Sequence, residues 1–257
     1  MTRQSRVESN TGIYHVMLRG INGQNIFECP EDHERFLMCP QRAKEKSGII
    51  LLGYCLMSNH AHLIIGAGTE PIGISFKRIG VSYVGWYNGK YKRRGPLFQD
   101  RFKSEPILND AYLLSALRYI HKNPVKAGMR GKAEDYKWSS FKDYLGAKNG
   151  LVDTGMILRM FSLKAAEQIN LFREFSELGG DSEDEGGFLD IDNEARPTDE
   201  ALRKKMVRIC GAGTVSEFQA LSSDKRAASL RIMRDSGMSI RQIVRMTGMP
   251  FGIVRKI

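Results

Sequence analysis

Strand-like and helix-like patterns of apolar residues alternate along the first half of the chain. Short apolar runs rich in β-branched residues predict four strands, at 13–19, 49–56, 61–66 and 101–107. Segments with apolar residues three or four positions apart predict three helices, at 30–47, 72–87 and 110–121. Asp110 is a suitable N-cap for the last helix, which must end or distort at Pro124 because proline has no amide hydrogen.

The order of these elements predicts the fold class. Strand, helix, two strands, helix, strand and helix is the order of the ferredoxin-like split βαβ pattern. We therefore expect an α+β fold whose antiparallel sheet carries its helices on one face. Helical periodicity returns later, and three parts are expected: a first domain over 1–150, a helical extension with an acidic linker over 151–197, and a small all-α domain over 198–257.

Charge is distributed in three blocks. The chain of 257 residues has a net charge of +10, but residues 181–200 alone carry −8, and the blocks before and after each carry +9. The acidic block contains the pair Gly186-Gly187 and Pro197, and the pair Gly179-Gly180 directly precedes it, which is typical of a linker. Basic surfaces of this size favour a polyanionic partner. From charge alone, a solvated charged surface is an equal alternative.

The composition excludes other classes of protein. A hydrophobic content of 42% with 26% charged residues is that of a folded protein. No window approaches the roughly 18 consecutive apolar residues of a transmembrane helix, and no apolar run near the N-terminus suggests a secretory signal. The four cysteines contain no C-x-x-C pair and do not suggest a disulfide framework. We therefore expect a cytoplasmic, nucleoid-associated protein with no membrane partner.

Two pairs of residues have the type and spacing of candidate metal-binding or catalytic side chains. His60 and His62 are two positions apart, so in a strand they project from one face, where two imidazoles can bind one divalent metal. Tyr119 and Asn123 are four positions apart and share one face of a helix. Each pair also has a plain structural interpretation: two unrelated polar residues at a strand end, and a buried tyrosine near a helix end.

A basic window interleaved with aromatic residues lies over 77–103. Cations that follow phosphates beside rings that stack on bases are typical of single-strand binding. The alternative is a helix whose aromatic residues belong to the core. The residues expected to contact nucleic acid here are Lys90, Lys92, Arg93, Arg94, Arg101 and Lys103, and Arg19 is added at the end of the first strand.

Several ordered motifs resemble one family. The strings are YHVMLRG at 14–20, GYCLMSNHAH at 53–62, LFQDRFK at 97–103 and RYIHKNPVKAG at 118–128, followed by WSS at 138–140. Over about 10–145 they resemble the HUH single-tyrosine transposases, and most of all the branch of REP-associated tyrosine transposases.

The resemblance implies a role for each matching residue. His60 and His62 match the histidines that bind Mg²⁺ or Mn²⁺, and Tyr119 matches the nucleophile. Asn123 stands at the position of the third metal ligand, which is often glutamine in relatives and has a longer side chain. The implied activity is cleavage and rejoining of single-stranded or hairpin DNA, with repeat palindromes among the candidates, through a 5′-phosphotyrosine.

The last 60 residues resemble, more weakly, the helix-turn-helix domains appended to some of these transposases. A helix over 240–247, a turn at Gly248 and a short helix after Pro250 follow that order. The residues expected to contact DNA are Arg241, Arg245 and Arg255. A helical protein–protein module is the alternative.

Three functions therefore remain in view. The first is a metal-dependent DNA strand transferase, the second a non-catalytic DNA-binding regulator with the same fold, and the third an RNA-binding protein. Relatives either exchange the tyrosine helix between subunits or act as monomers, so both a homodimer and a monomer are compatible with the sequence.

Overall fold

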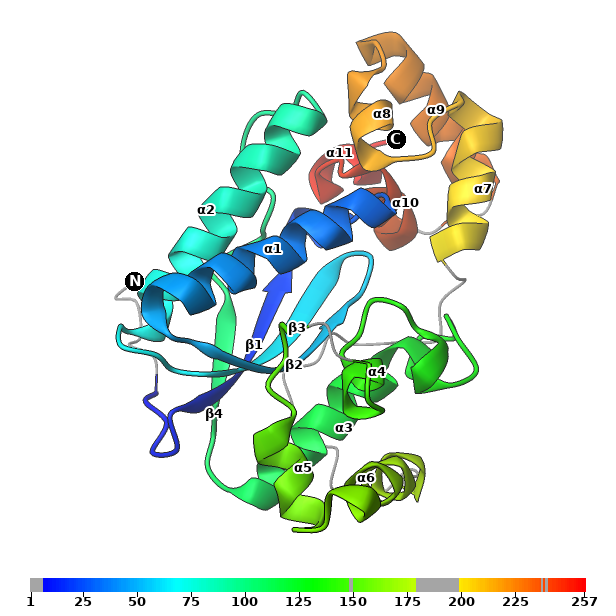
Figure 1. Cartoon of the computed structure of the whole chain (residues 1–257). Coiled ribbons are helices and arrows are strands. Elements are labelled where there is room, and N and C mark those ends of the chain that lie inside the picture. The colour runs from blue at the N-terminus through cyan, green and yellow to red at the C-terminus, as the bar shows by residue number, and fades with distance from the viewer. Residues whose placement is uncertain (1–6, 148–149, 179–198, 237, 239) are drawn as a thin grey trace.

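The computed structural model describes residues 7–147, 150–178, 199–236, 238 and 240–257 (Figure 1). Its strands are β1 (Ile13–Arg19), β2 (Ile50–Leu56), β3 (His60–Gly66) and β4 (Lys103–Ile107). The longer helices of its first part are α1 (Pro30–Ser47), α2 (Ile72–Lys90) and α3 (Asp110–Lys126). Short helical segments are η1 (Ile21–Gly23), η2 (Ala133–Asp135), α4 (Phe141–Tyr144) and α5 (Gly155–Phe161), before α6 (Ala165–Leu178).

The sheet confirms the predicted split βαβ fold. Its four strands are antiparallel in the order β2-β3-β1-β4. Each strand lies within two residues of its predicted bounds. The central strands β1 and β3 pair over their whole length, from Ile13 opposite Gly66 to Arg19 opposite His60. This register places Met17 opposite His62, so the end of β1 lies beside the two predicted metal ligands.

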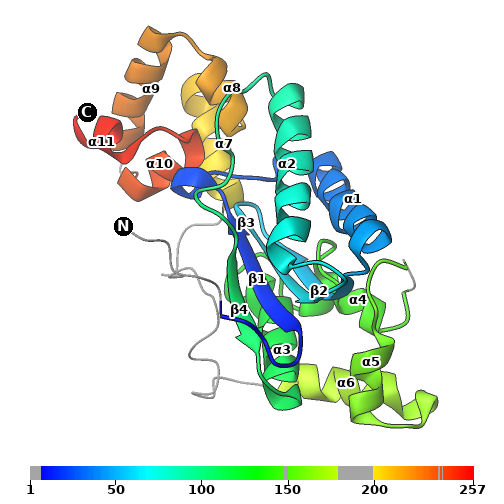
Figure 2. The same ribbon diagram turned by 90° about the vertical axis from the view of Figure 1, so that its left-hand side faces the viewer.

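Helices cover both faces of the sheet, which corrects the prediction of helices on one face (Figures 1 and 2). The helices α1 and α2 pack on one face, against residues such as Val16 and Leu63. The helix α3 packs on the other face, against residues such as Ile64 and Leu52. Consecutive residues of the central strands are buried, so both faces must be covered, as in sheets whose strands are apolar on both sides.

The helix α3 differs from its prediction at both ends. Its N-cap is Asn109, whose side chain accepts a hydrogen bond from the Tyr112 amide, where Asp110 was expected. It continues through Pro124 to Lys126, because in the last turn the missing proline amide removes only one hydrogen bond. The helix lies very close to β2: a Cβ at Gly53 would stand 2.5 Å from Leu117 Cδ1. A larger residue here would require Leu117 to shift.

The C-terminal helices enclose a hydrophobic cluster of their own. They are α7 (Asp199–Cys210), α8 (Val215–Ala220), α9 (Ser223–Asp235), α10 (Ile240–Thr247) and α11 (Phe251–Arg255). Met206, Phe218 and Ile243 are fully buried at their centre. The predicted acidic linker lies outside the described residues. No helix in the described ranges is both long and apolar enough to cross a bilayer.

Candidate active site

Three histidines from two adjacent strands gather on the face that α3 covers. His60 and His62 of β3 share that face, and His15 of β1 lies beside them. The rings of His15 and His62 are stacked with centroids 5.1 Å apart, and those of His60 and His62 are perpendicular at 5.0 Å. At most 6% of any of these three residues is exposed.

Both β3 imidazoles have one ring nitrogen engaged by a neighbour. His60 Nδ1 lies 2.7 Å from Asn59 Oδ1, and His62 Nδ1 lies 2.9 Å from His15 Nε2. Among the described residues, His62 Nε2 is buried without a hydrogen-bond partner. A histidine that binds a metal through one nitrogen usually donates the other N–H to a neighbour in this way.

The environment keeps these imidazoles neutral. Burial, and then the charge of Arg19, lowers the pKa of His60 to about 3. Burial, followed by the neighbouring His60 and His15, lowers the pKa of His62 well below its usual value. A neutral imidazole has a lone pair to give to a metal, whereas a protonated one has none.

Tyr119 reaches this cluster from α3, and Asn123 lies one turn further along the same helix. The Tyr119 ring is perpendicular to His62 at 5.9 Å and edge-on to His15 at 6.2 Å between centroids. Lys126 Nζ stands 5.3 Å from the Tyr119 ring centroid. Asn123 is buried, and its amide nitrogen donates to the Tyr119 carbonyl at 3.3 Å. The amide oxygen is thus the atom of Asn123 that could serve as a ligand.

The candidate ligand atoms at this site suit a divalent metal ion. They are the nitrogens of two neutral imidazoles and one amide oxygen, and the buried Nε2 of His62 has the lone pair such an ion takes. In the described part of the chain no three His, Cys, Asp or Glu side chains form a metal cluster.

Most of the predicted DNA contacts lie on the surface. Lys92, Arg94, Arg101, Lys103 and Arg255 are exposed. Arg19 is half-buried at the end of β1, directly opposite His60.

Lys90 is an exception among the predicted DNA contacts, because its charge is already paired within the fold. Its ammonium group lies 2.7 Å from Asp32 Oδ1 and 2.7 Å from Glu31 Oε2. Two carboxylates already neutralise its charge within the fold, which leaves little attraction for a phosphate.

The aromatic residues of the basic window belong to the core, as the alternative interpretation predicted. Tyr83 and Tyr87 are fully buried on α2, and their hydroxyls donate to the backbone carbonyls of Ile26 and Asn25. The other four pack, partly buried, against the same cluster: Trp86, Tyr91, Phe98 and Phe102. Stacking of bases on these rings is therefore not part of the function we propose.

Two of the predicted cations lie where the C-terminal helices meet the first part of the chain. A Cβ at Gly23 in η1 would stand 3.9 Å from both Arg19 Nη2 and Arg245 Cγ. Arg93 Nη2 lies 3.4 Å from Gln24 Oε1, next to that segment. Arg245 thus faces η1, although the helix-turn-helix interpretation expected it on an outer surface. The side chain of Arg241 lies outside the described set.

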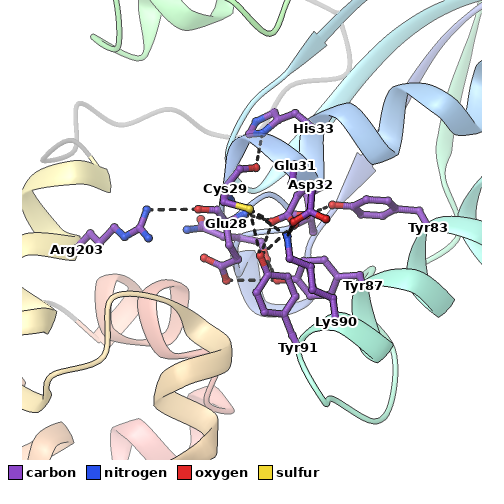
Figure 3. Close-up of polar contacts among 12 residues, drawn as sticks. Glu28, Cys29, Glu31, Asp32, His33, Tyr83, Tyr87, Lys90, Tyr91 and Arg203 are labelled. Carbon is purple, nitrogen blue, oxygen red and sulfur yellow. Dashed lines mark hydrogen bonds and ion pairs between the residues drawn. The ribbon is translucent and has the colours of Figure 1, made fainter.

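A second buried polar cluster surrounds the N-terminus of α1 (Figure 3). Asp32 is fully buried and accepts hydrogen bonds from the Glu28 and Cys29 amides, the Tyr91 hydroxyl and Lys90. Beside it, burial raises the pKa of Glu28 to about 7, against the opposing effect of Arg203. Arg203 of α7 also donates to the Glu28 carbonyl at 3.5 Å, so this cluster contacts the C-terminal helices.

Sequence reasoning missed His15, Glu105 and Lys126. His15 was quoted within YHVMLRG without a role, although a histidine in the middle of an apolar strand was a usable signal. Lys126 follows Tyr119 by seven residues, the spacing of two helical turns, and was hidden by the expectation that the helix ends earlier. His121 was expected to point elsewhere, and it does: its Nε2 lies 2.8 Å from Ser140 Oγ.

Comparison with known proteins agrees with this geometry. Residues 8–123 match the family model described as "Transposase IS200 like", and this span contains His60, His62, Tyr119 and Asn123. No curated protein matches the chain. A solved structure described as "Structure of the REP associates tyrosine transposase bound to a REP hairpin" is similar with a TM-score of 0.50 and 17% identity, over 60% of this chain and 90% of that chain. At this identity the likeness concerns the fold. Residues 8–123 are thus similar to the IS200-like transposases, in line with the resemblance that the sequence motifs gave.

Proposed function

We propose that this protein is a metal-dependent DNA strand transferase that cleaves and rejoins single-stranded or hairpin DNA through Tyr119. The observation that carries the proposal is the position of a tyrosine on α3 against two neutral histidines on β3, with the Tyr119 and His62 rings 5.9 Å apart. Nucleophile and metal ligands come from different elements, yet they meet on one buried face.

Tyr119 acts as the nucleophile in this proposal. Its Oη attacks the scissile phosphorus and loses its proton, while the bond from phosphorus to the 3′ oxygen breaks and that oxygen takes up a proton. A 5′-phosphotyrosyl bond and a free 3′-hydroxyl result. The new bond keeps the phosphodiester energy, so the 3′-hydroxyl can reverse the reaction and join strands without ATP.

A phenol of pKa about 10 is a weak nucleophile at neutral pH and needs help. Mg²⁺ or Mn²⁺ bound by His60, His62 and the Asn123 oxygen supplies a Lewis acid for the phosphate. Lys126, 5.3 Å from the Tyr119 ring centroid, lowers the cost of negative charge on Oη.

In this proposal exposed cations of the chain bind the DNA backbone. Lys92, Arg94, Arg101 and Lys103 carry positive charge on the surface of the first part of the chain, and Arg255 carries it on the C-terminal helices. The similar solved structure holds a REP hairpin, and we propose hairpin DNA for this chain. The single-stranded part then enters the Tyr119 site, and the duplex part meets the C-terminal helices.

Formation of a covalent protein–DNA adduct tests this function. End-labelled single-stranded and hairpin oligonucleotides are incubated with the protein in Mn²⁺, Mg²⁺ or EDTA and resolved on denaturing gels. We expect an adduct in the presence of metal that Tyr119→Phe abolishes while DNA binding remains. Binding of DNA without an adduct would instead identify a regulator, and preference for RNA would identify an RNA-binding protein.

A further inference from the structure

A line of three polar side chains crosses three adjacent strands beneath α3. Glu105 of β4 pairs directly with His15 of β1, and its Oε2 lies 3.8 Å from His15 Nδ1. His15 Nε2 in turn lies 2.9 Å from Nδ1 of His62 on β3. The line ends at His62 Nε2, the buried nitrogen that the site would offer to a metal.

Packing alone does not account for a histidine at position 15. The residue is fully buried, and the β1 residues on the same face, Ile13 and Met17, are apolar. Burying a polar ring costs free energy unless its nitrogens form hydrogen bonds, so an apolar residue at position 15 would be less destabilising. The two nitrogens of His15 instead face one partner each, a carboxylate and an imidazole.

The positions of the protons follow from these partners. For His62 to give the Nε2 lone pair, its proton must be on Nδ1, from where it is donated to His15 Nε2. His15 Nε2 must then be the acceptor, which puts the His15 proton on Nδ1, facing the Glu105 carboxylate. The charge of one carboxylate, 3.8 Å from His15 Nδ1, thus favours this tautomer in both imidazoles.

We propose that His15 and Glu105 are positioning residues that hold His62 in the tautomer able to bind metal. The inference rests on the proposed function of His62 as a metal ligand and extends it to two residues on other strands. Tyr112 of α3 supports the outer end, since burial and a hydrogen bond to Glu105 raise the pKa of its hydroxyl. Asn59 has the same positioning role for His60, because its Oδ1 lies 2.7 Å from His60 Nδ1.

The tautomer of His62 can be measured without any substitution. In the full chain labelled with ¹⁵N-histidine and free of metal at pH 7.5, two-dimensional ¹⁵N–¹H spectra distinguish Nδ1–H from Nε2–H imidazoles. We expect His62 and His15 to carry their protons on Nδ1, and Glu105→Gln to move part of the His15 population to Nε2–H. An Nε2–H tautomer of His62 in the wild type would overturn the proposal.

Binding of Mn²⁺ provides a second readout that needs no DNA. We expect His15→Phe to weaken Mn²⁺ affinity, measured by calorimetry, by about 10- to 100-fold, which is typical of lost outer-shell partners. Glu105→Gln should weaken it less, and His15→Gln, whose amide oxygen can accept from His62, should recover part of the loss. The matched control is Ser104→Ala, on the other face of β4, which should bind as the wild type does.

These outcomes separate the two proposals. If His62→Ala leaves Mn²⁺ affinity unchanged, the metal site itself is wrong. If His62→Ala weakens binding but folded His15→Phe and Glu105→Gln stay within twofold of the wild type, the metal site stands and the positioning role is refuted.

Discussion

The two faces of the sheet bury polar groups in opposite ways. On the face of α1 and α2, the Asp32 carboxylate accepts hydrogen bonds from two backbone amides, a tyrosine and a lysine. On the face of α3, His15 Nε2 and His62 Nδ1 lie within hydrogen-bond distance of each other. The second nitrogen of His62, Nε2, is buried and has no hydrogen-bond partner among the described residues.

This difference distinguishes buried polar groups that stabilise the fold from buried polar groups that can bind a ligand. A buried charge whose hydrogen-bonding capacity is met inside the protein stabilises the fold once its partners are in place, and removing one partner is costly. A buried nitrogen whose capacity is not met costs stability and is retained where a ligand completes it. Substitutions on the first face should therefore change stability, and those on the second should change catalysis.

The largest effect is expected on the α3 face. His60→Ala and His62→Ala should each reduce the rate of adduct formation by about 10³-fold, since Lewis-acid stabilisation of the phosphate is worth several kcal/mol. Thermal stability should change little, which differential scanning fluorimetry can verify. The wild type in EDTA is the matched condition, and cleavage there at full rate would exclude the metal role.

Asp32→Ala tests the opposite face. Removing a buried carboxylate that accepts from Lys90, Tyr91 and two amides should lower the free energy of unfolding by about 3–5 kcal/mol. Glu31→Ala is the matched control, because Glu31 pairs with the same Lys90 at 2.7 Å but is 65% exposed. Its loss should cost about 1 kcal/mol or less in urea titrations. Equal losses for the two variants would contradict the distinction.

Glu28→Gln gives a pH-dependent prediction. The pKa of Glu28 is raised to about 7, so between pH 4.5 and 7 the folded state binds more protons than the unfolded state. The contribution of Glu28 to stability therefore falls as pH rises through this window. Glu28→Gln should become more stable relative to the wild type by about 3 kcal/mol from pH 4.5 to 8. A difference in unfolding free energy that stays constant with pH would contradict this.

The smallest effects concern the surface cations. Lys92→Ala and Arg94→Ala should each weaken DNA binding a few-fold and reduce the slope of log K against log salt by about 1, as for a lost phosphate contact. Lys90→Ala should leave that slope unchanged and lower stability, because its ammonium is held by Asp32 and Glu31. Fluorescence anisotropy at several salt concentrations measures the DNA affinity of the three variants. A reduced slope for Lys90→Ala would show that Lys90 contacts DNA.

The fold was predictable where local pattern determines structure. The strand and helix order followed from periodicity, and the bounds of α1 were predicted to the residue because Pro30 opens the helix and Gly48 takes the left-handed conformation that ends it. The second covered face of the sheet was missed, since a short apolar run does not show whether one side or both are buried.

The candidate site was predictable only in part. The spacing of His60 with His62 and of Tyr119 with Asn123 placed each pair on one face of its own element. Residue spacing does not predict which residues of different elements contact each other. His15 and Glu105 lie 47 and 43 residues from His62 in the sequence, and the pairing of the strands brings them to the site. The ion pairs of Lys90 were also not predictable, because a single sequence does not show that a lysine at the end of one helix meets carboxylates of another.

The close approach of α3 to β2 at Gly53 also concerns the active site. Leu117 and Ile120, on either side of Tyr119, lie over the space where a side chain at position 53 would stand. A larger side chain at position 53 would press on these two residues of α3, the helix that carries Tyr119. The packing of the nucleophile's helix is therefore open to change from a position that contacts neither the tyrosine nor the histidines.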